Sequence, residues 1–176
     1  MPQKKNVKTQ EKEKRTSVMN LNINGRSYEL QIGSGAGQVD VSHTLAHTLR
    51  ETLGLTGTKI SCDSGACGCC TVLIDRKAIP SCSILTVDCN DKEIITIEGL
   101  SDPVTGTLDP IQQAFIDHTA FQCGFCTPGM IMSAKALLLA NPSPTEDEVK
   151  DALSGNFCRC ISHYQVVRAV MDASRR

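Results

Sequence analysis

The ten cysteines of this 176-residue chain constrain it more than any other feature, because most of them fall into two spaced sets. The first set follows the pattern C-x4-C-x2-C with a fourth cysteine further on, and it comprises Cys62, Cys67, Cys70 and Cys82. The second set consists of two close pairs, Cys123-x2-Cys126 and Cys158-x-Cys160. Chains this rich in cysteine are either disulfide scaffolds of secreted proteins or carriers of metal and redox chemistry in a reducing compartment.

The N-terminal segment favours the second class. Residues 1–18 read MPQKKNVKTQEKEKRTSV and contain neither an apolar run nor paired arginines, so we expect no secretory leader. Because the segment is polar and rich in Lys and Glu, we expect it to be a disordered lead-in. No stretch approaches the roughly 20 apolar residues that span a bilayer, so we expect a cytoplasmic chain without membrane insertion.

The next part of the chain, residues 19–99, predicts a small α+β domain. Residues 19–24 alternate apolar and polar side chains, as a half-buried strand does, and Asn24-Gly25 is a strong hairpin signal. Apolar residues at four-residue intervals then predict a helix that Ser42 or Thr44 caps. The remaining expected elements are the return strand with Tyr28, Leu30 and Ile32, the helix with Leu45, Leu49 and Leu53, and strands at 71–74 and 93–97.

After a linker at residues 100–108, residues 109–176 predict a helical domain. Thr145 and Glu148 are spaced as a capping box, and Asn141-Pro142-Ser143-Pro144 separates two helices. Gly155 is typical of a left-handed residue that ends a helix. The expected helices span residues 110–119, 129–140, 145–154 and 162–173.

The first cysteine set has the spacing of a plant-type 2Fe–2S cluster. Such a loop must bring several thiolates together and aim backbone N–H groups at their sulfurs, and Gly65 and Gly68 give this loop the freedom to do so. A zinc site or simple burial is the alternative, but zinc more often uses paired C-x2-C units.

The second cysteine set leaves zinc as a serious alternative on spacing alone. Both of its pairs precede expected helices, whose N-termini favour an anionic ligand such as a cluster held by four thiolates. The short C-x-C pair is unusual for zinc. Cys69 and Cys89 stand outside both sets, and we interpret them as structural cysteines.

Three segments closely resemble the cluster motifs of the molybdenum hydroxylase family, which includes xanthine dehydrogenase, aerobic carbon monoxide dehydrogenase and 4-hydroxybenzoyl-CoA reductase. They occur in the family's order, and the resemblance covers about residues 19–173. The segments are GTKISCDSGACGCCTV at 57–72, QCGFCTPGM at 122–130 and LSGNFCRC at 153–160.

The resemblance implies a β-grasp ferredoxin-like domain followed by a four-helix bundle domain, in the small iron–sulfur subunit of a larger oxidoreductase. It implies a large subunit that holds molybdopterin and usually a medium subunit that holds FAD, with two 2Fe–2S clusters relaying electrons between them. It places the helical-domain cluster nearer the molybdenum cofactor. It also implies that Gln122 hydrogen-bonds the pterin and that Cys160 lies against it.

The chain departs from the family pattern at two places. Cys69 stands where a small residue such as Ala is usual, and Ile161-Ser162-His163-Tyr164 is one residue longer than the usual Thr-Gly-Tyr. The second departure leaves the cluster ligands intact but puts the local pterin contacts in doubt. His163 is either a hydrogen-bond donor near the cofactor or a solvated residue at a helix start.

Two other functions compete with a docked electron-transfer subunit. One is a stand-alone ferredoxin-like carrier or redox sensor, which needs only the first domain. The other is a zinc-stabilised interaction module. The formal net charge of −1 gives no support to nucleic-acid binding. We find neither a Ser/His/Asp arrangement nor a phosphate-binding G-x-x-x-x-G-K motif, so we expect substrate chemistry on a partner chain.

Overall fold

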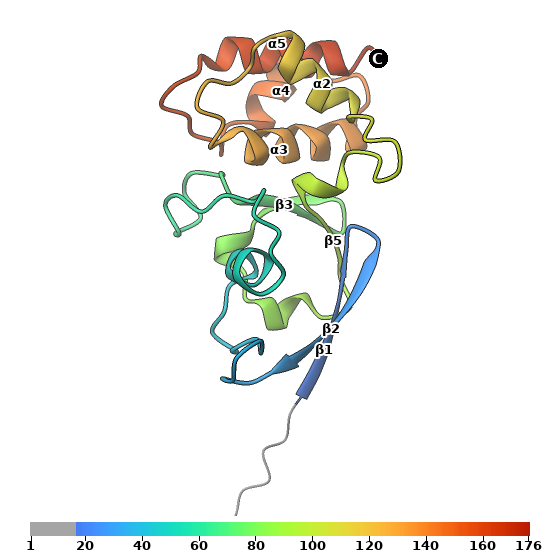
Figure 1. Cartoon of the computed structure of the whole chain (residues 1–176). Helices are drawn as coiled ribbons and strands as arrows, with labels where there is room; N and C mark the ends of the chain where they lie inside the picture. Colours follow the sequence, from blue (N-terminus) through green and yellow to red (C-terminus); the bar gives the residue numbers. More distant parts are fainter. Residues whose placement is uncertain (1–16) are drawn as a thin grey trace, which may run out of the picture.

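The computed structural model describes residues 17–176, in which a mixed sheet is followed by a group of helices (Figure 1). The sheet half contains five strands and one short α-helix: β1 (Ser17–Ile23), β2 (Arg26–Ile32), α1 (Leu45–His47), β3 (Thr71–Ile74), β4 (Lys77–Pro80) and β5 (Glu93–Ile95). The helical half contains α2 (Pro110–Asp117), α3 (Thr127–Ala140), α4 (Glu146–Ala152) and α5 (His163–Ala173). Short irregular helical turns lie at Thr48–Thr52, Ser81–Ser83, Thr86–Cys89 and Ile97–Gly99.

The sheet has the strand order β2-β1-β5-β3-β4. β1 pairs antiparallel with β2 and parallel with β5, whereas β3 is antiparallel to both β4 and β5. The Asn24-Gly25 turn that joins β1 to β2 has positive φ at both residues, as the sequence predicted. Alternate residues of β1 point inward, so that Leu21 and Ile23 are fully buried beneath Leu45 and Leu49.

Two capping boxes begin helices in the second half. Thr145 and Glu148 form the predicted one at the start of α4, and Asp109 with Gln112 forms another at the start of α2. Each box satisfies backbone N–H groups that the first turn of a helix leaves without partners. Phe115, Met130 and Val170 are among the buried residues that join these helices in one apolar core.

The helical half rests on the sheet half through α3, which contacts β3 and β4 and lies nearest the sheet in Figure 1. The contact is very close at Gly129, because a Cβ there would lie 2.0 Å from the carbonyl oxygen of Gly68. The loop that contains Gly68 also carries the first cysteine set. The first turn of α3 therefore brings the two cysteine regions together.

Several expected elements differ in detail from the structure. β1 begins at Ser17, inside the expected lead-in, whose residues 1–16 lie outside the described residues. The expected helix with Leu45, Leu49 and Leu53 is one α-helical turn that continues as a π-helical turn, with Thr44 as its N-cap. β4 was not anticipated, since it is short and ends in a proline. Gly155 does not adopt a left-handed conformation, so that expectation was wrong.

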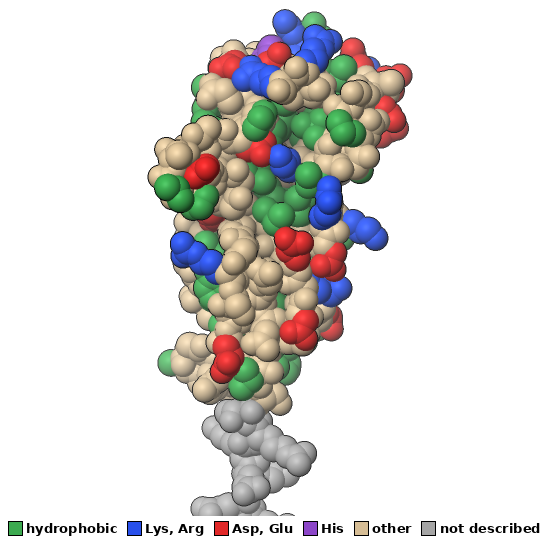
Figure 2. All heavy atoms as spheres, turned by 90° about the vertical axis from the view of Figure 1, so that its right-hand side faces the viewer, with side chains coloured by type: hydrophobic (Ala, Val, Ile, Leu, Met, Phe, Trp, Pro, Cys, Tyr) green, Lys and Arg blue, Asp and Glu red, His purple; other side chains and the backbone are tan. Residues whose placement is uncertain are grey.

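The surface carries charges of both signs. On the face shown in Figure 2, hydrophobic side chains gather near the junction of the two halves, and acidic and basic side chains are interspersed around them. Within residues 17–176, no helix is both long and apolar enough to cross a membrane.

Candidate metal centres

The first cysteine set forms two thiol pairs, from three cysteines in the loop before β3 and one in the turn after β4. Cys62 contacts Cys67, and Cys70 contacts Cys82, which the turn at Ser81–Ser83 carries. The backbone N–H of Gly65 donates to Cys82 Sγ at 3.2 Å, so the loop between the first pair also touches the second. Gly65 has a φ of +73°, a conformation that glycine adopts without strain.

The members of the first set differ in exposure and in proton affinity. Cys62 is exposed, and hydrogen bonds from Ser64 and then Cys67 lower the pKa of its thiol to about 6. Cys70 is buried, and the burial raises the pKa of its thiol to about 11. A buried thiol of this kind needs a nearby cation to lose its proton, because desolvation disfavours the thiolate.

The second cysteine set also forms two pairs, drawn from two loops that are far apart in sequence. Cys160 Sγ lies 3.6 Å from Cys123 Sγ, and Cys126 contacts Cys158. Cys126 is the N-cap residue of α3, whereas Cys158 and Cys160 precede α5. A helix N-terminus thus follows each of the two loops of this site, and the helix dipoles favour negative charge there.

Backbone donors converge on one sulfur of this second set. The N–H groups of Cys160 and Ile161 each donate to Cys158 Sγ at 3.3 Å. Although burial raises the pKa of Cys158, bonds from Ile161, Cys126 and Cys160 outweigh it and leave the pKa below its ordinary value. The pKa of its partner Cys126 is raised to about 12, first by burial and then by Cys158.

The paired arrangement distinguishes between kinds of metal site. Within the described residues, no three Cys, His, Asp or Glu side chains converge closely enough to hold a single metal ion. A tetrahedral zinc site needs four donors around one point, whereas a 2Fe–2S cluster needs two donors for each of two irons. Two thiol pairs per set therefore fit a binuclear cluster better than zinc.

The two cysteine sets are neighbours. The backbone N–H of Phe157 donates to the carbonyl oxygen of Cys67 at 3.0 Å, which joins the residue before Cys158 to a member of the first set. Cys67 and Cys158 both pack against the apolar core of the helical half, in which Cys126 is buried. A single hydrogen bond thus connects the backbones of the two sites.

Comparison with known proteins agrees with this geometry. A family model described as a 2Fe-2S iron-sulfur cluster binding domain matches residues 33–95, and a [2Fe-2S] binding domain model matches residues 96–171. The nicotine 6-hydroxylase small subunit of Paenarthrobacter nicotinovorans is 52% identical over 135 residues, covering 77% of this chain and 80% of that protein. The nicotinate dehydrogenase small FeS subunit of Eubacterium barkeri is 39% identical, covering 90% of this chain and 96% of that protein.

A solved structure is similar to this chain in fold and sequence. Quinoline 2-oxidoreductase from Pseudomonas putida 86 matches with a TM-score of 0.83 and 39% identity, covering 92% of this chain and 95% of that one. The chain belongs to the iron–sulfur subunits of the molybdenum hydroxylase family. As a member, it is an electron-transfer subunit with two 2Fe–2S domains.

Two thiols of this iron–sulfur subunit lie outside the two spaced sets, although the thiol of one of them, Cys69, contacts that of Cys67. Cys69 is 5% exposed and packs into the helical core with Cys126, and burial raises the pKa of its thiol to about 12. Cys89 is fully buried in the core of the sheet half, where its thiol donates to the carbonyl oxygen of Leu85. Both positions agree with the interpretation of these residues as structural cysteines.

The second site of the iron–sulfur subunit opens to the surface. Gln122, Cys123 and Cys160 are all exposed, as is His163, the first residue of α5. The chain has six Phe and Tyr residues, and three of them are exposed in this region of the sequence: Phe125 (46%), Phe157 (63%) and Tyr164 (64%). Exposed aromatic residues are typical of protein–protein interfaces.

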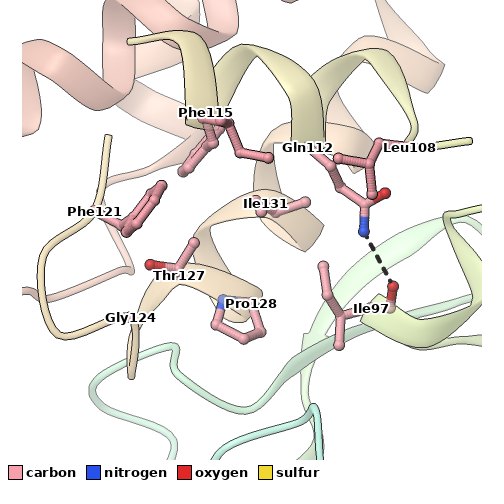
Figure 3. A pocket seen from close by; sticks show the side chains of 10 residues that line it. Ile97, Leu108, Gln112, Phe115, Phe121, Gly124, Thr127, Pro128 and Ile131 are labelled. Carbon is pink, nitrogen blue, oxygen red and sulfur yellow. Dashed lines mark hydrogen bonds between the residues drawn. The ribbon is translucent and has the colours of Figure 1, made fainter. Parts of the chain in front are cut away.

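An apolar pocket of about 320 Å³ lies beside the loop that carries Cys123 and Cys126 (Figure 3). Phe115, Phe121 and Ile131 line it, and the amide of Gln112 at its edge donates to the carbonyl oxygen of Ile97 at 3.4 Å. Among residues 17–176, no titratable side chain lines this pocket.

Sequence reasoning missed the contacts that join the two sites. Asn156 belongs to the third motif, yet its amide donates to the carbonyl oxygen of Gly68 in the first cysteine loop, 88 residues away. The only sequence signal was the position of Asn156 two residues before Cys158. The side chain of Asn156 is 3% exposed, which is unusual for an amide in a loop.

Proposed function

We propose that this chain holds two 2Fe–2S clusters and relays electrons between a molybdopterin site on a large partner subunit and FAD on a medium subunit or an external acceptor. The observation that carries the proposal is the pairing of the thiols, since each set supplies two donors to each of two irons. The proposed ligands are Cys62, Cys67, Cys70 and Cys82 for one cluster, and Cys123, Cys126, Cys158 and Cys160 for the other.

The finer architecture belongs to the same proposal. The sheet half is a β-grasp ferredoxin-like domain, and the helices α2 to α5 form a four-helix bundle domain. The cysteines of the described residues are free thiols rather than disulfides, which suits a reducing compartment, so we place the protein in the cytoplasm.

The protein's own part in the relay is to hold and tune the clusters. Each cluster, when bound, accepts and donates one electron. The N–H groups of Gly65, Cys160 and Ile161 donate to ligand sulfurs, and such bonds stabilise negative charge on a cluster. The first turn of α3 adds the favourable end of a helix dipole beside Cys126.

The exposed second site is the side that faces the molybdenum subunit in this proposal. Gln122 offers both donor and acceptor atoms to a heterocycle such as the pterin, and Cys160 is equally accessible. The exposed rings of Phe125 and Phe157 flank ligands of the same cluster and suit burial against a partner. The glycine-rich first site then lies toward the flavin or the external acceptor.

Metal analysis tests the proposal. We expect four irons and four acid-labile sulfides per chain, and two distinct EPR signals after reduction. Cys70→Ser and Cys126→Ser should each remove one signal and about half of the iron, because each removes one of four thiolates from one cluster. Two irons per chain, or stoichiometric zinc, would show that the assignment is wrong.

A further inference from the structure

The two cysteine loops meet at one buried oxygen atom. The carbonyl oxygen of Gly68, between Cys67 and Cys70, accepts a hydrogen bond from Asn156 Nδ2 at 3.0 Å. It also accepts from the backbone N–H and the hydroxyl of Thr71, at 3.2 Å and 2.8 Å. Of these donors, only Asn156 comes from the other cysteine loop.

The packing around this oxygen leaves almost no freedom. Gly68 has a φ of +70°, and a Cβ there would lie 2.5 Å from both Asn156 Nδ2 and the carbonyl oxygen of Gly155. A Cβ at Gly129, in the first turn of α3, would lie 2.0 Å from the Gly68 oxygen. The loop with Gly68 is therefore confined between the start of α3 and the loop with Asn156.

A backbone hydrogen bond next to Asn156 also joins the two loops. The next residue, Phe157, donates its N–H to the carbonyl oxygen of Cys67 at 3.0 Å. Through these two hydrogen bonds, the adjacent residues Asn156 and Phe157 connect the loop of Cys158 to the loop of Cys67. Because the Phe157 bond is made by backbone, Asn156 supplies the side-chain part of this connection.

We propose that Asn156 is a positioning residue that fixes the separation of the two clusters and thereby sets the rate of electron exchange between them. This inference rests on the proposed function, because it needs both clusters to be present. In the exchange, one electron leaves a reduced cluster and enters an oxidised one, and no covalent bond forms or breaks. Among the described residues, the amide donates to the Gly68 oxygen and to no cysteine sulfur, so it acts on distance and alignment rather than on either potential.

Two variants test the proposal in the assembled complex. Asn156→Asp keeps the shape but replaces the amide donor with a carboxylate facing the Gly68 oxygen, and Asn156→Ala removes the donor without adding charge. We expect both variants to keep four irons and both EPR signals with unchanged midpoint potentials. We expect the two reduced clusters of the wild type to interact magnetically, and we expect both variants to weaken that interaction and to slow electron exchange between the clusters several-fold.

A matched control uses the other side-chain donor to the same oxygen. Thr71→Val removes the hydroxyl bond within the first loop and leaves the bond between the loops, so the interaction between clusters should remain as in the wild type. An unchanged interaction in both Asn156 variants would overturn the proposal. So would loss of a whole cluster in both, because Asn156 would then serve assembly of a site rather than spacing. If the wild type itself lacks two 2Fe–2S clusters, the proposed function fails first, and metal analysis of the wild type distinguishes that outcome.

Discussion

At the scale of single residues, thiol pairing separates the proposed ligands from Cys89 but not by itself from Cys69, whose thiol contacts that of Cys67. Each proposed ligand touches a second thiol of its own set, and backbone N–H groups reach Cys62, Cys82 and Cys158. Cys89 has only a backbone carbonyl as partner and lies within the sheet core. Cys69 is held in the helical core, and in sequence it lies between the proposed ligands Cys67 and Cys70.

We predict that Cys69→Ser and Cys89→Ser leave both clusters in place. Neither thiol belongs to a spaced set, and Cys67, which Cys69 contacts, keeps Cys62 as its partner, so the irons keep all their donors. We expect both variants to be less stable than the wild type, because each change puts a more polar hydroxyl into an apolar site. EPR spectra of the reduced proteins check the first expectation, and Cys67→Ser is the control that should lose a signal. Loss of either signal in the Cys69 or Cys89 variant would mean that the ligand assignment is wrong.

The sequence predicted the cysteine sets but not the contact between them. Spacing identifies which thiols share a loop, because residues close in sequence are close in space. The hydrogen bond from Asn156 to Gly68 joins residues 88 positions apart, and it depends on how α3 packs on β3. Such a contact becomes visible only when the packing of the two halves is known.

At the scale of elements, capping decides where the helices begin. Asp109 accepts a bond from the Ile111 N–H at 3.1 Å, and Gln112 accepts one from the Asp109 N–H at 3.0 Å. Asp109 also forms an ion pair with Lys135 of α3, and both side chains are largely buried. The Asp109 side chain therefore caps the N-terminus of α2 and also joins α2 to α3 through the ion pair with Lys135.

We predict that Asp109→Ala lowers the stability of the chain by about 1–2 kcal/mol, the usual cost of losing an N-cap. Heating the cluster-loaded protein while following its visible absorbance should show a midpoint that is lower by roughly 2–8 °C. Asp109→Asn keeps a capping oxygen but loses the ion pair, so comparing the two variants separates the two contributions. Equal midpoints for Asp109→Ala and the wild type would show that the cap contributes nothing.

Sequence patterns predicted the long elements better than the short ones. The β1–β2 hairpin and the four helices carry strong periodic or capping signals, and the structure contains them with ends shifted by a few residues. β4 has no such signal, and the spacing of Leu45, Leu49 and Leu53 predicted a helix without indicating its π-helical turn at Thr48–Thr52. β4 forms because β3 offers it a partner, and pairing of that kind depends on the sheet as a whole.

At the scale of the whole molecule, the two sites differ in what they present to a partner. In the second site Cys123 and Cys160 are exposed beside Gln122, whereas Cys126 is buried toward the first site. This site therefore has an outward pair that a partner can approach and an inward pair next to Cys67. This arrangement fits a relay in which electrons enter the second cluster at its outward pair and leave through the first cluster.

We predict that Gln122→Ala slows the reduction of both clusters by substrate in the assembled complex, because the exposed amide next to Cys123 is the proposed contact to the pterin. Reduction by dithionite should be unchanged, since that reagent bypasses the molybdenum site. Stopped-flow absorbance compares the two routes in one preparation. Gln113→Ala is the matched control, because this half-buried amide on α2 bonds only Asp117 among the described residues and should slow neither route. If substrate reduces the Gln122→Ala clusters as fast as those of the wild type, Gln122 has no role in the coupling, and entry at the outward pair must depend on Cys160.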